Sequence, residues 1–294
     1  MPASAWADFG GNAKGTASGG FLKLPVGAGA IGMGEAYTAV ADDATALYWN
    51  PAGLTRIEKR SATFMHSTYI DDSYHDYVAV GGQAGQAGAA GLSFQYLSAG
   101  KITRTDTSGL DAGEFTPHDL AVSAGYARSL DLLSGGLAFK YIQSEIIHTA
   151  QTWAFDLGVL SRPLLDQKLR LGFSALNLGG TLKYNAVAEE LPVTLRGGGA
   201  YKINGKWLAS LDLVAPRDEE PHVALGTSYL VMTGKDVDLA GRLGYNSRNA
   251  GDVDGITGIS LGIGIKYGQG IFDYAFVPYG SVGQAHRFSI SVRF

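Results

Sequence analysis

The sequence predicts an all-β fold: a 14-stranded antiparallel transmembrane β-barrel with an N-terminal plug or hatch segment. Three observations predict this class. From Ser61 onward, apolar residues alternate with small or charged residues with a period of two, the number of such segments is even, and their connections are short at one end and mostly longer at the other. Because successive side chains of a strand point to opposite faces, the alternation is typical of strands with two chemically different faces.

The composition narrows the class of protein further. The chain has 294 residues, of which 46% are hydrophobic and 17% are charged, with 42 glycines and no cysteine. The net charge is −4 and no basic cluster occurs, so nucleic acid is not expected as a partner. No apolar run approaches about 18 residues, so a transmembrane helix is not expected.

Fourteen strands follow from the turn residues that separate the alternating segments. In the clearest segment, apolar residues occupy every second position from Ile259 to Tyr267, opposite glycine, serine and lysine. A strand of about ten residues tilted by about 40–45° rises about 24 Å, close to the apolar band of an outer-membrane barrel, about 25 Å. The predicted strands cover residues 61–70, 73–82, 88–98, 116–128, 135–146, 151–162, 167–177, 192–203, 206–215, 221–231, 236–246, 256–268, 270–279 and 285–294.

The polar face of these strands indicates which side meets lipid. It is rich in glycine, alanine and serine and carries charges in mid-strand, which suits a crowded polar lumen. We expect these charges to form either a network that holds the plug, which is favoured, or a polar path for a solute headgroup. The expected lumen residues are Lys140, Asp156, Arg196, Asp212, Asp238, Arg242 and Asp273.

Aromatic residues support the same orientation, since they fall near both ends of the strands, as in the two girdles of a membrane barrel. At the short-turn end these are Tyr126, Tyr201, Trp207, Tyr229, Tyr267 and Phe294, and at the long-loop end Tyr69, Tyr96, Tyr141, Trp153 and Tyr245. A soluble β-rich surface or filament protein is the alternative, and it would be soluble without detergent.

Residues 1–60 lack the alternation and are predicted to fill the lumen as a plug or hatch, with residues 61–294 forming the barrel. A filler is needed because a barrel of about fourteen strands is wider than the roughly eight strands whose side chains fill an interior. Short helices are expected at 35–40 and 44–47, with Asp42 or Asp43 as N-cap. A turn at Asn50-Pro51-Ala52-Gly53 follows them.

Two stretches resemble a known family. Residues 27–54, GAGAIGMGEAYTAVADDATALYWNPAGL, resemble the N-terminal signature of the PorV/PorQ family of outer-membrane proteins, and residues 273–280 and 286–294 resemble its ending. That family is similar to the FadL group of hydrophobic-solute transporters, whose fourteen-stranded barrels carry an N-terminal hatch with an Asn-Pro-Ala motif. The residues that the resemblance assigns to the hatch are Gly32, Gly34, Asp42, Asp43, Asn50, Pro51 and Ala52.

The resemblance implies a barrel in the bacterial outer membrane, with both termini periplasmic. It implies passage or presentation of hydrophobic molecules such as lipid or fatty-acid-like solutes, entering by an apolar pocket between long loops and wall. The alternative is a non-conducting docking component of a type IX secretion-like complex. Expected partners are outer-membrane lipids, a hydrophobic small molecule, secretion-complex proteins and the barrel assembly machinery, which would read the terminal Phe294.

Motifs for other chemistry are weak. Gly27-x-Gly29-x-x-Gly32 matches the dinucleotide fingerprint, but no second strand-helix-strand pattern follows it. The histidines are scattered, no G-x-S-x-G occurs and cysteine is absent, so neither catalytic residues nor a cofactor are expected. A metal cluster of His66 and His75 with Asp71 and Asp72 is conceivable, but a solvated loop is the preferred interpretation and no metal is expected.

Overall fold

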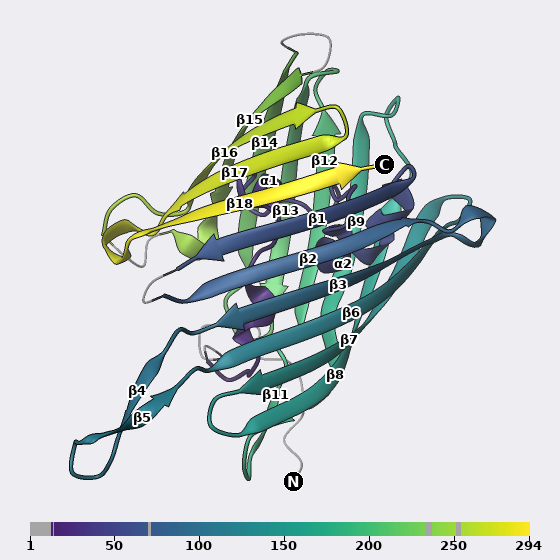
Figure 1. The fold of residues 1–294 in the computed structure, drawn as a ribbon. Helices are drawn as coiled ribbons and strands as arrows, with labels where there is room; N and C mark the ends of the chain where they lie inside the picture. The colour runs from purple at the N-terminus through teal and green to yellow at the C-terminus, as the bar shows by residue number, and fades with distance from the viewer. Residues whose placement is uncertain (1–12, 14, 70–71, 233–236, 251–253) are drawn as a thin grey trace.

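The computed structural model describes residues 13, 15–69, 72–232, 237–250 and 254–294. Its fourteen long antiparallel strands form one closed barrel, in which each strand pairs with its neighbours along the chain and β1 pairs with β18 (Figure 1). The predicted all-β class, a 14-stranded antiparallel barrel, is confirmed. The barrel strands are β1 (Arg60–Thr68), β2 (Tyr74–Gln83), β3 (Ala89–Ser98), β6 (His118–Ser129), β7 (Leu133–Glu145), β8 (Thr149–Ser161), β9 (Leu169–Gly179), β12 (Thr194–Lys202), β13 (Trp207–Pro216), β14 (His222–Met232), β15 (Val237–Asn246), β16 (Ile259–Tyr267), β17 (Gly270–Pro278) and β18 (Gln284–Arg293).

Two small hairpins in the long loops were not predicted. They are β4 (Ile102–Thr105) with β5 (Asp111–Phe115), and β10 (Thr181–Lys183) with β11 (Ala188–Glu190). Strands of three to five residues carry too few positions for a period-two pattern to stand out. The β4–β5 hairpin extends well beyond the barrel at the long-loop end (Figure 1).

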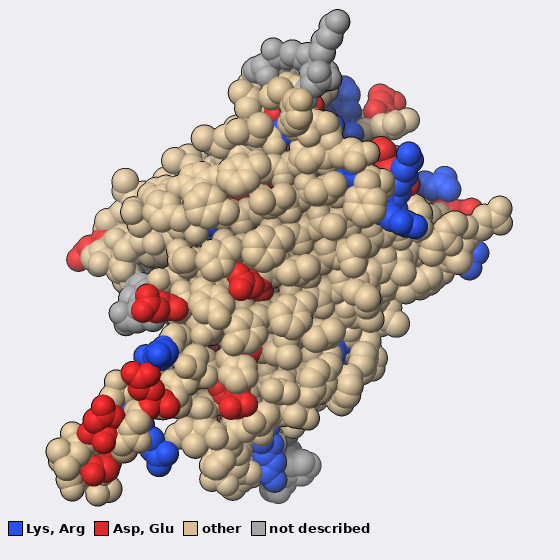
Figure 2. Space-filling model, viewed as in Figure 1, with Lys and Arg blue, Asp and Glu red and all other residues tan. Residues whose placement is uncertain are grey.

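The outer face of the barrel is apolar and the inner face is small or charged, as the alternation predicts. On β16, Ile263 is 57% exposed while Ser260 on the opposite face is buried. Most of the wall in Figure 2 carries no charge, and Lys, Arg, Asp and Glu gather toward the ends. A soluble monomer rarely exposes an apolar surface of this extent, whereas a barrel in hydrocarbon requires one. None of the described helices is long and apolar enough to cross a membrane.

The aromatic positions agree with two girdles, with one correction. Trp207 and Tyr229 are exposed at the short-turn end, and Trp153 and Tyr245 are exposed at the long-loop end. Tyr69 instead turns inward, where its hydroxyl accepts a hydrogen bond from Arg287 (2.9 Å). It lies at the end of β1, where the chain leaves the sheet alternation.

The N-terminal segment, residues 15–57, lies inside the barrel (Figure 1). Its first described pairing is a bridge from Ala17 to Glu190 in the long-loop hairpin β10–β11, and it ends beside β1 at the short-turn end. The segment therefore runs from one end of the barrel to the other. Its helical turns are η2 (Gly20–Lys23), α1 (Ala28–Ile31), α2 (Ala46–Trp49) and η3 (Pro51–Arg56), and the loops carry η4 (Gly85–Ala87), η5 (Ser247–Asn249) and η6 (Gly280–Val282).

The helix predicted at 35–40 is absent, and turns stand in its place. Gly34 (φ 63°) and Glu35 (φ 71°) adopt the left-handed region, which a helix cannot contain. The predicted helix at 44–47 corresponds to α2, displaced by two residues. Asp43 precedes it and accepts a hydrogen bond from the N–H of Thr45 (2.8 Å).

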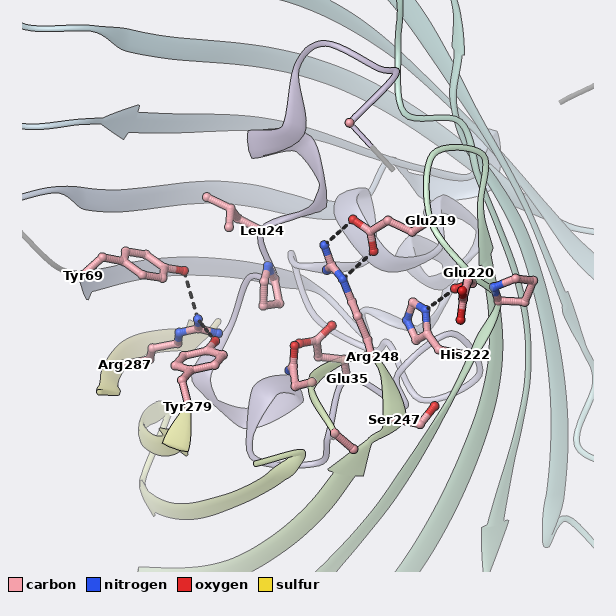
Figure 3. A pocket seen from close by; sticks show the side chains of 15 residues that line it. Leu24, Glu35, Tyr69, Glu219, Glu220, His222, Ser247, Arg248, Tyr279 and Arg287 are labelled. Atoms are coloured by element: carbon pink, nitrogen blue, oxygen red, sulfur yellow. Dashed lines mark hydrogen bonds and ion pairs between the residues drawn. The ribbon is translucent and has the colours of Figure 1, made fainter. Parts of the chain in front are cut away.

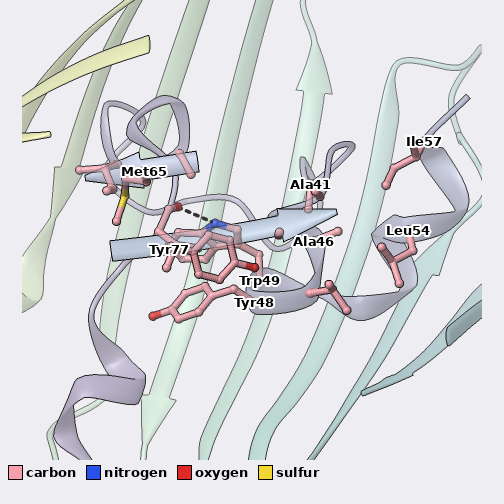
Figure 4. Close-up of a cluster of buried hydrophobic side chains, with 14 of the residues drawn as sticks. Ala41, Ala46, Tyr48, Trp49, Leu54, Ile57, Met65 and Tyr77 are labelled. Carbon is pink, nitrogen blue, oxygen red and sulfur yellow. Dashed lines mark hydrogen bonds between the residues drawn. The ribbon is translucent and has the colours of Figure 1, made fainter. Parts of the chain in front are cut away.

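Packing between segment and wall explains the glycine content. A Cβ on Gly32 would lie 2.8 Å from the Cα of Gly262 on β16, so both positions need glycine for the two backbones to approach. The apolar contact is centred on Trp49, which is fully buried and donates its indole N–H to the carbonyl of Val26 (3.1 Å) (Figure 4). The interior core therefore lies between the segment and the wall.

Candidate functional site

A buried carboxylate holds the N-terminal segment in mid-barrel. Asp212, on the inner face of β13, has no exposed surface. Its Oδ2 accepts hydrogen bonds from the backbone N–H groups of Tyr37 (3.0 Å) and Thr38 (2.9 Å) and from the Thr38 hydroxyl (2.6 Å). Hydrogen bonds to an ionised carboxylate are roughly twice as strong as neutral ones. Asp212 therefore fixes the turn that replaces the predicted helix.

Arg196, on the neighbouring strand β12, completes this anchor. Its Nη2 lies 3.1 Å from Oδ2 of Asp212 and donates to the carbonyl of Glu35 (2.6 Å). Its guanidinium carbon lies 4.9 Å from the ring centre of Trp49, within cation–π range. One ion pair of the wall thus binds the segment through backbone, hydroxyl and aromatic groups at once.

The Asn-Pro-Ala motif lies against β7 and β8. The Asn50 side chain donates to the carbonyls of Thr38 (3.0 Å) and Val159 (3.1 Å), and its Oδ1 accepts from the N–H of Ala52 (3.1 Å). Asn50 thereby caps η3, with Pro51 in the first helical position where its missing N–H costs nothing. The motif joins two turns of the segment to the wall.

Four of the five remaining lumen residues form two separate ion pairs. Lys140 lies 2.7 Å from Asp156, and both contact Asn177, where β9 bulges. Arg242 lies 2.7 Å from Asp273. Asp238 faces the interior near the short-turn end and forms no ion pair with any described residue.

Other predicted hatch residues have structural contacts. Gly34 donates its N–H to the Ser260 hydroxyl (3.0 Å). Asp42 lies 2.9 Å from Arg293 at the end of β18 and 3.6 Å from Arg56. Burial, followed by the charge of Asp42, raises the pKa of Asp43.

Phe294 continues the seam of the barrel at the short-turn end. Its N–H donates to the carbonyl of Arg60 (3.0 Å), and its carbonyl accepts from the N–H of Arg60 (2.9 Å). The aromatic ring remains exposed. These two hydrogen bonds fix the backbone of Phe294 beside β1, and its side chain points to the outside.

A cavity of about 640 Å³ lies at the long-loop end, and Leu24, Pro25 and Glu35 of the segment form part of its lining (Figure 3). We call it the long-loop cavity. The expected apolar entry pocket is not found here, since charged groups from the segment, the loops and β18 line this cavity. Its charged lining consists of Glu35, Glu219, Glu220, Arg248 and Arg287, and the imidazole of His222 lies among them.

Opposite charges are largely matched inside the long-loop cavity. Nε of Arg248 lies 2.7 Å from Glu219. Burial opposes ionisation of Glu219, but the charges of Arg248 and Lys23 outweigh it and lower the pKa of this carboxyl. Burial raises the pKa of Glu35, against the opposing effect of the surrounding arginines.

Arg287 is a residue that the sequence reasoning did not single out. It is 1% exposed, and its Nη2 donates to the hydroxyls of Tyr69 (2.9 Å) and Tyr279 (3.0 Å) (Figure 3). The one sequence signal for Arg287 was a charge on the inward face of β18. The contacts with the two tyrosines could not be predicted, because Tyr69 and Tyr279 lie just beyond strand ends, where the alternation no longer gives the direction of a side chain.

A second cavity, of about 450 Å³, lies at the opposite end and is called the short-turn cavity. It is bounded by the segment at Ala39–Asp42 and Arg56, by the β8–β9 and β12–β13 turns, and by the inner faces of β9 and β12–β15. Its charged lining consists of Arg56, Lys168, Arg170, Lys202, Lys206, Arg242 and Arg293, with Asp42 as the carboxylate.

The conceivable metal cluster near the first long-side loop is not assembled by the described residues. His66 pairs with Asp76 (2.6 Å), while His75 turns inward and contacts Gln95 (3.1 Å). Asp71 lies outside the described residues. Within the described ranges, no three His, Cys, Asp or Glu side chains gather as metal ligands would.

The chain resembles known proteins in its fold, while its sequence identity to them is low. Residues 3–115 match the model of the Uncharacterised protein family (UPF0164). No curated protein sequence matches the chain. Among solved structures, the Pseudomonas putida toluene transporter TodX superposes with a TM-score of 0.59 and 13% identity over 92% of this chain and 98% of that one.

Two further structures agree. The Ralstonia pickettii toluene transporter TbuX has a TM-score of 0.57 and 12% identity, covering 92% of this chain and 98% of its own. A Pseudomonas aeruginosa FadL homologue has a TM-score of 0.58 and 11% identity, covering 92% and 99%. The fold is that of the FadL-type outer-membrane barrels. At these identities the likeness shows the fold alone.

Proposed function

We propose that this chain is an outer-membrane barrel that passes hydrophobic molecules, including lipid or fatty-acid-like ones, under control of the N-terminal segment acting as a hatch. The observation that carries the proposal is the division of the interior into two cavities with the segment between them. A continuous path requires the segment to move. The likeness to toluene transporters supports the class of solute, and the polar interior pairs are the holding network of the hatch.

A reversible crosslink tests hatch control. The chain has no cysteine, so a pair of introduced cysteines is unique. Ala44 in the segment donates its N–H to the Ser61 hydroxyl on β1 (3.3 Å), which makes Ala44→Cys with Ser61→Cys a lock between segment and wall. In liposomes, we expect oxidation to suppress uptake of toluene and reduction to restore it.

The matched control is a crosslink between two strands of the barrel, β1 and β18. Thr63 and Ser291 face each other across β1 and β18, with their hydroxyls 2.9 Å apart. Thr63→Cys with Ser291→Cys forms a disulfide that leaves the segment unattached, and uptake should persist after oxidation. If the Ala44–Ser61 lock, shown to be oxidised, leaves uptake unchanged, hatch control is wrong.

Orientation and partners follow from the same proposal. The short-turn end, with Phe294, would face the periplasm, and its exposed ring would serve the barrel assembly machinery, while outer-membrane lipids surround the apolar wall. The expected periplasmic N-terminus falls in residues 1–12, outside the described residues, and Ala17 lies at the long-loop end. Replacing Phe294→Ala should slow assembly into vesicles.

A docking role in a secretion complex, as the PorV/PorQ resemblance implies, is the second candidate. The exposed β4–β5 hairpin, which projects beyond the barrel, favours it. In this case, deletion of residues 101–115 would abolish co-purification of translocon proteins from the native membrane without changing solute uptake. Failure to co-purify any such protein with the full chain would remove this candidate.

A further inference from the structure

The short-turn cavity is strongly cationic. Among the described residues, seven lysine or arginine side chains line it against one carboxylate, Asp42. Asp42 is shared by Arg56 and Arg293, and Arg242 is paired with Asp273. The cations that form no ion pair with a described carboxylate are Lys168, Arg170, Lys202 and Lys206.

Three of these cations are neighbours at the edge of two paired strands. Lys202 donates its N–H to the carbonyl of Lys168 (2.8 Å), and Arg170 lies two residues further along β9, opposite Ala200. Side chains placed opposite each other on paired strands are about 5 Å apart, where like charges destabilise a sheet. Such a cluster raises the energy of the empty cavity, and an anion between the side chains would lower it.

The cavity also has an apolar side. Val40 of the segment, Leu208 of β13 and Leu230 of β14 line it together with the cations. A volume of about 450 Å³ falls in the range of small-molecule sites, about 300–1,000 Å³. Cations beside aliphatic side chains match a ligand that carries both an acidic group and a hydrocarbon chain.

We propose that the short-turn cavity binds the carboxylate or phosphate headgroup of an anionic amphiphile, with Lys168, Arg170 and Lys202 as its ligands. The chain of the amphiphile lies against Val40, Leu208 and Leu230. This inference goes beyond the proposed function, because binding at this end requires neither passage through the barrel nor movement of the hatch.

Binding to the full chain in non-ionic detergent tests the site. The probes share one alkyl chain and differ in headgroup: decanoate, decyl phosphate and decanol. A variant with Lys168→Gln, Arg170→Gln and Lys202→Gln should bind both anionic probes at least about tenfold more weakly, since three charged contacts are lost. Decanol should bind the two proteins equally, and added salt should weaken only the anionic probes.

A control variant removes the same charge from the other end. Lys101, Arg104 and Lys183 are exposed in the long-loop hairpins, and their replacement by glutamine should leave every affinity unchanged. Equal losses in both variants would show a net-charge effect and overturn the site. An unchanged affinity in the first variant, or decanol binding as tightly as decanoate to the wild type, would also overturn it.

Two further measurements keep the result interpretable. Lys168→Arg with Lys202→Arg preserves the charges and should retain anion binding, which separates loss of charge from loss of fold. Inorganic phosphate at the same concentration should fail to displace decyl phosphate; if it displaces the probe, the site takes free anions and the amphiphile assignment is overturned. Because these assays involve no uptake, their outcome is independent of the hatch crosslink.

Discussion

The two cavities at the ends of the barrel differ in charge although one short segment bounds both. In the long-loop cavity, Glu35, Glu219 and Glu220 balance Arg248 and Arg287. The described lining of the short-turn cavity has seven cations and one carboxylate. The segment contributes to both, with Glu35 toward one end and Arg56 toward the other.

The segment therefore lies between two different electrostatic environments. Charges in a concave site with a low-dielectric wall focus the field at its mouth. An anion therefore has lower energy at the short-turn end than at the long-loop end. The difference between the two cavities depends on the segment staying in place, and substitutions that disturb first the segment and then each cavity test it.

The largest effect on stability is expected from Asp212→Asn, which would release the segment from the wall and so join the two cavities. It leaves Arg196 buried without its carboxylate and weakens the bonds to Tyr37 and Thr38. Breaking a buried pair costs about 3–5 kcal/mol. Denaturant unfolding should register this loss, and proteases should cleave the segment. Asp238→Asn, on the same inner face, should change stability by no more than about 0.5 kcal/mol.

Gly158→Val should push the Asn-Pro-Ala motif of the segment away from β8 and lower stability. A Cβ at Gly158 would meet Asn50 and would lie 2.8 Å from Cδ of Pro51, and such overpacking costs about 1–3 kcal/mol. Gly197→Val is the matched control, because nothing lies within 4 Å of its Cβ position. Equal melting temperatures for the two variants would mean that the motif does not press on the wall.

Glu35→Gln should alter the pH dependence of stability through the long-loop cavity. Because burial raises the pKa of Glu35 in the folded state, folding is favoured when this carboxyl is protonated, and stability falls as pH rises above the ordinary pKa of glutamate. The variant should therefore be more stable than wild type at pH 7, with a difference that shrinks by pH 4. Melting temperatures of the variant and the wild type across this pH range test the prediction.

Asp42→Asn should have the smallest effect on stability and a visible one on binding. Its ion pairs with Arg56 and Arg293 are partly exposed, and such pairs contribute about 0–1 kcal/mol. Asp42 is the one carboxylate among the described residues that line the short-turn cavity, so its removal should tighten decanoate binding there. Weaker binding in this variant would contradict the electrostatic account.

Much of this architecture is encoded locally. A period of two places each apolar residue outward and each small or charged residue inward, so strand number, barrel class and the inward direction of Asp212, Arg196 and Asp273 follow from the pattern. The residues expected in a hatch followed from a resemblance and from the lack of alternation before residue 61. These properties depend on neighbours one or two positions away in the chain.

Tertiary structure decided which of these groups meet. Arg196 and Asp212 lie on the paired strands β12 and β13, and both meet Thr38 because the N-terminal segment packs against these strands. The same holds for Tyr69 and Arg287, joined by the β1–β18 seam, and for the cations of the short-turn cavity, gathered from separate turns. The alternation specifies which face of the sheet a residue occupies. It does not specify the position of the residue along the barrel axis or its contact across the lumen, because these depend on strand register and on the path of a segment that has no periodicity.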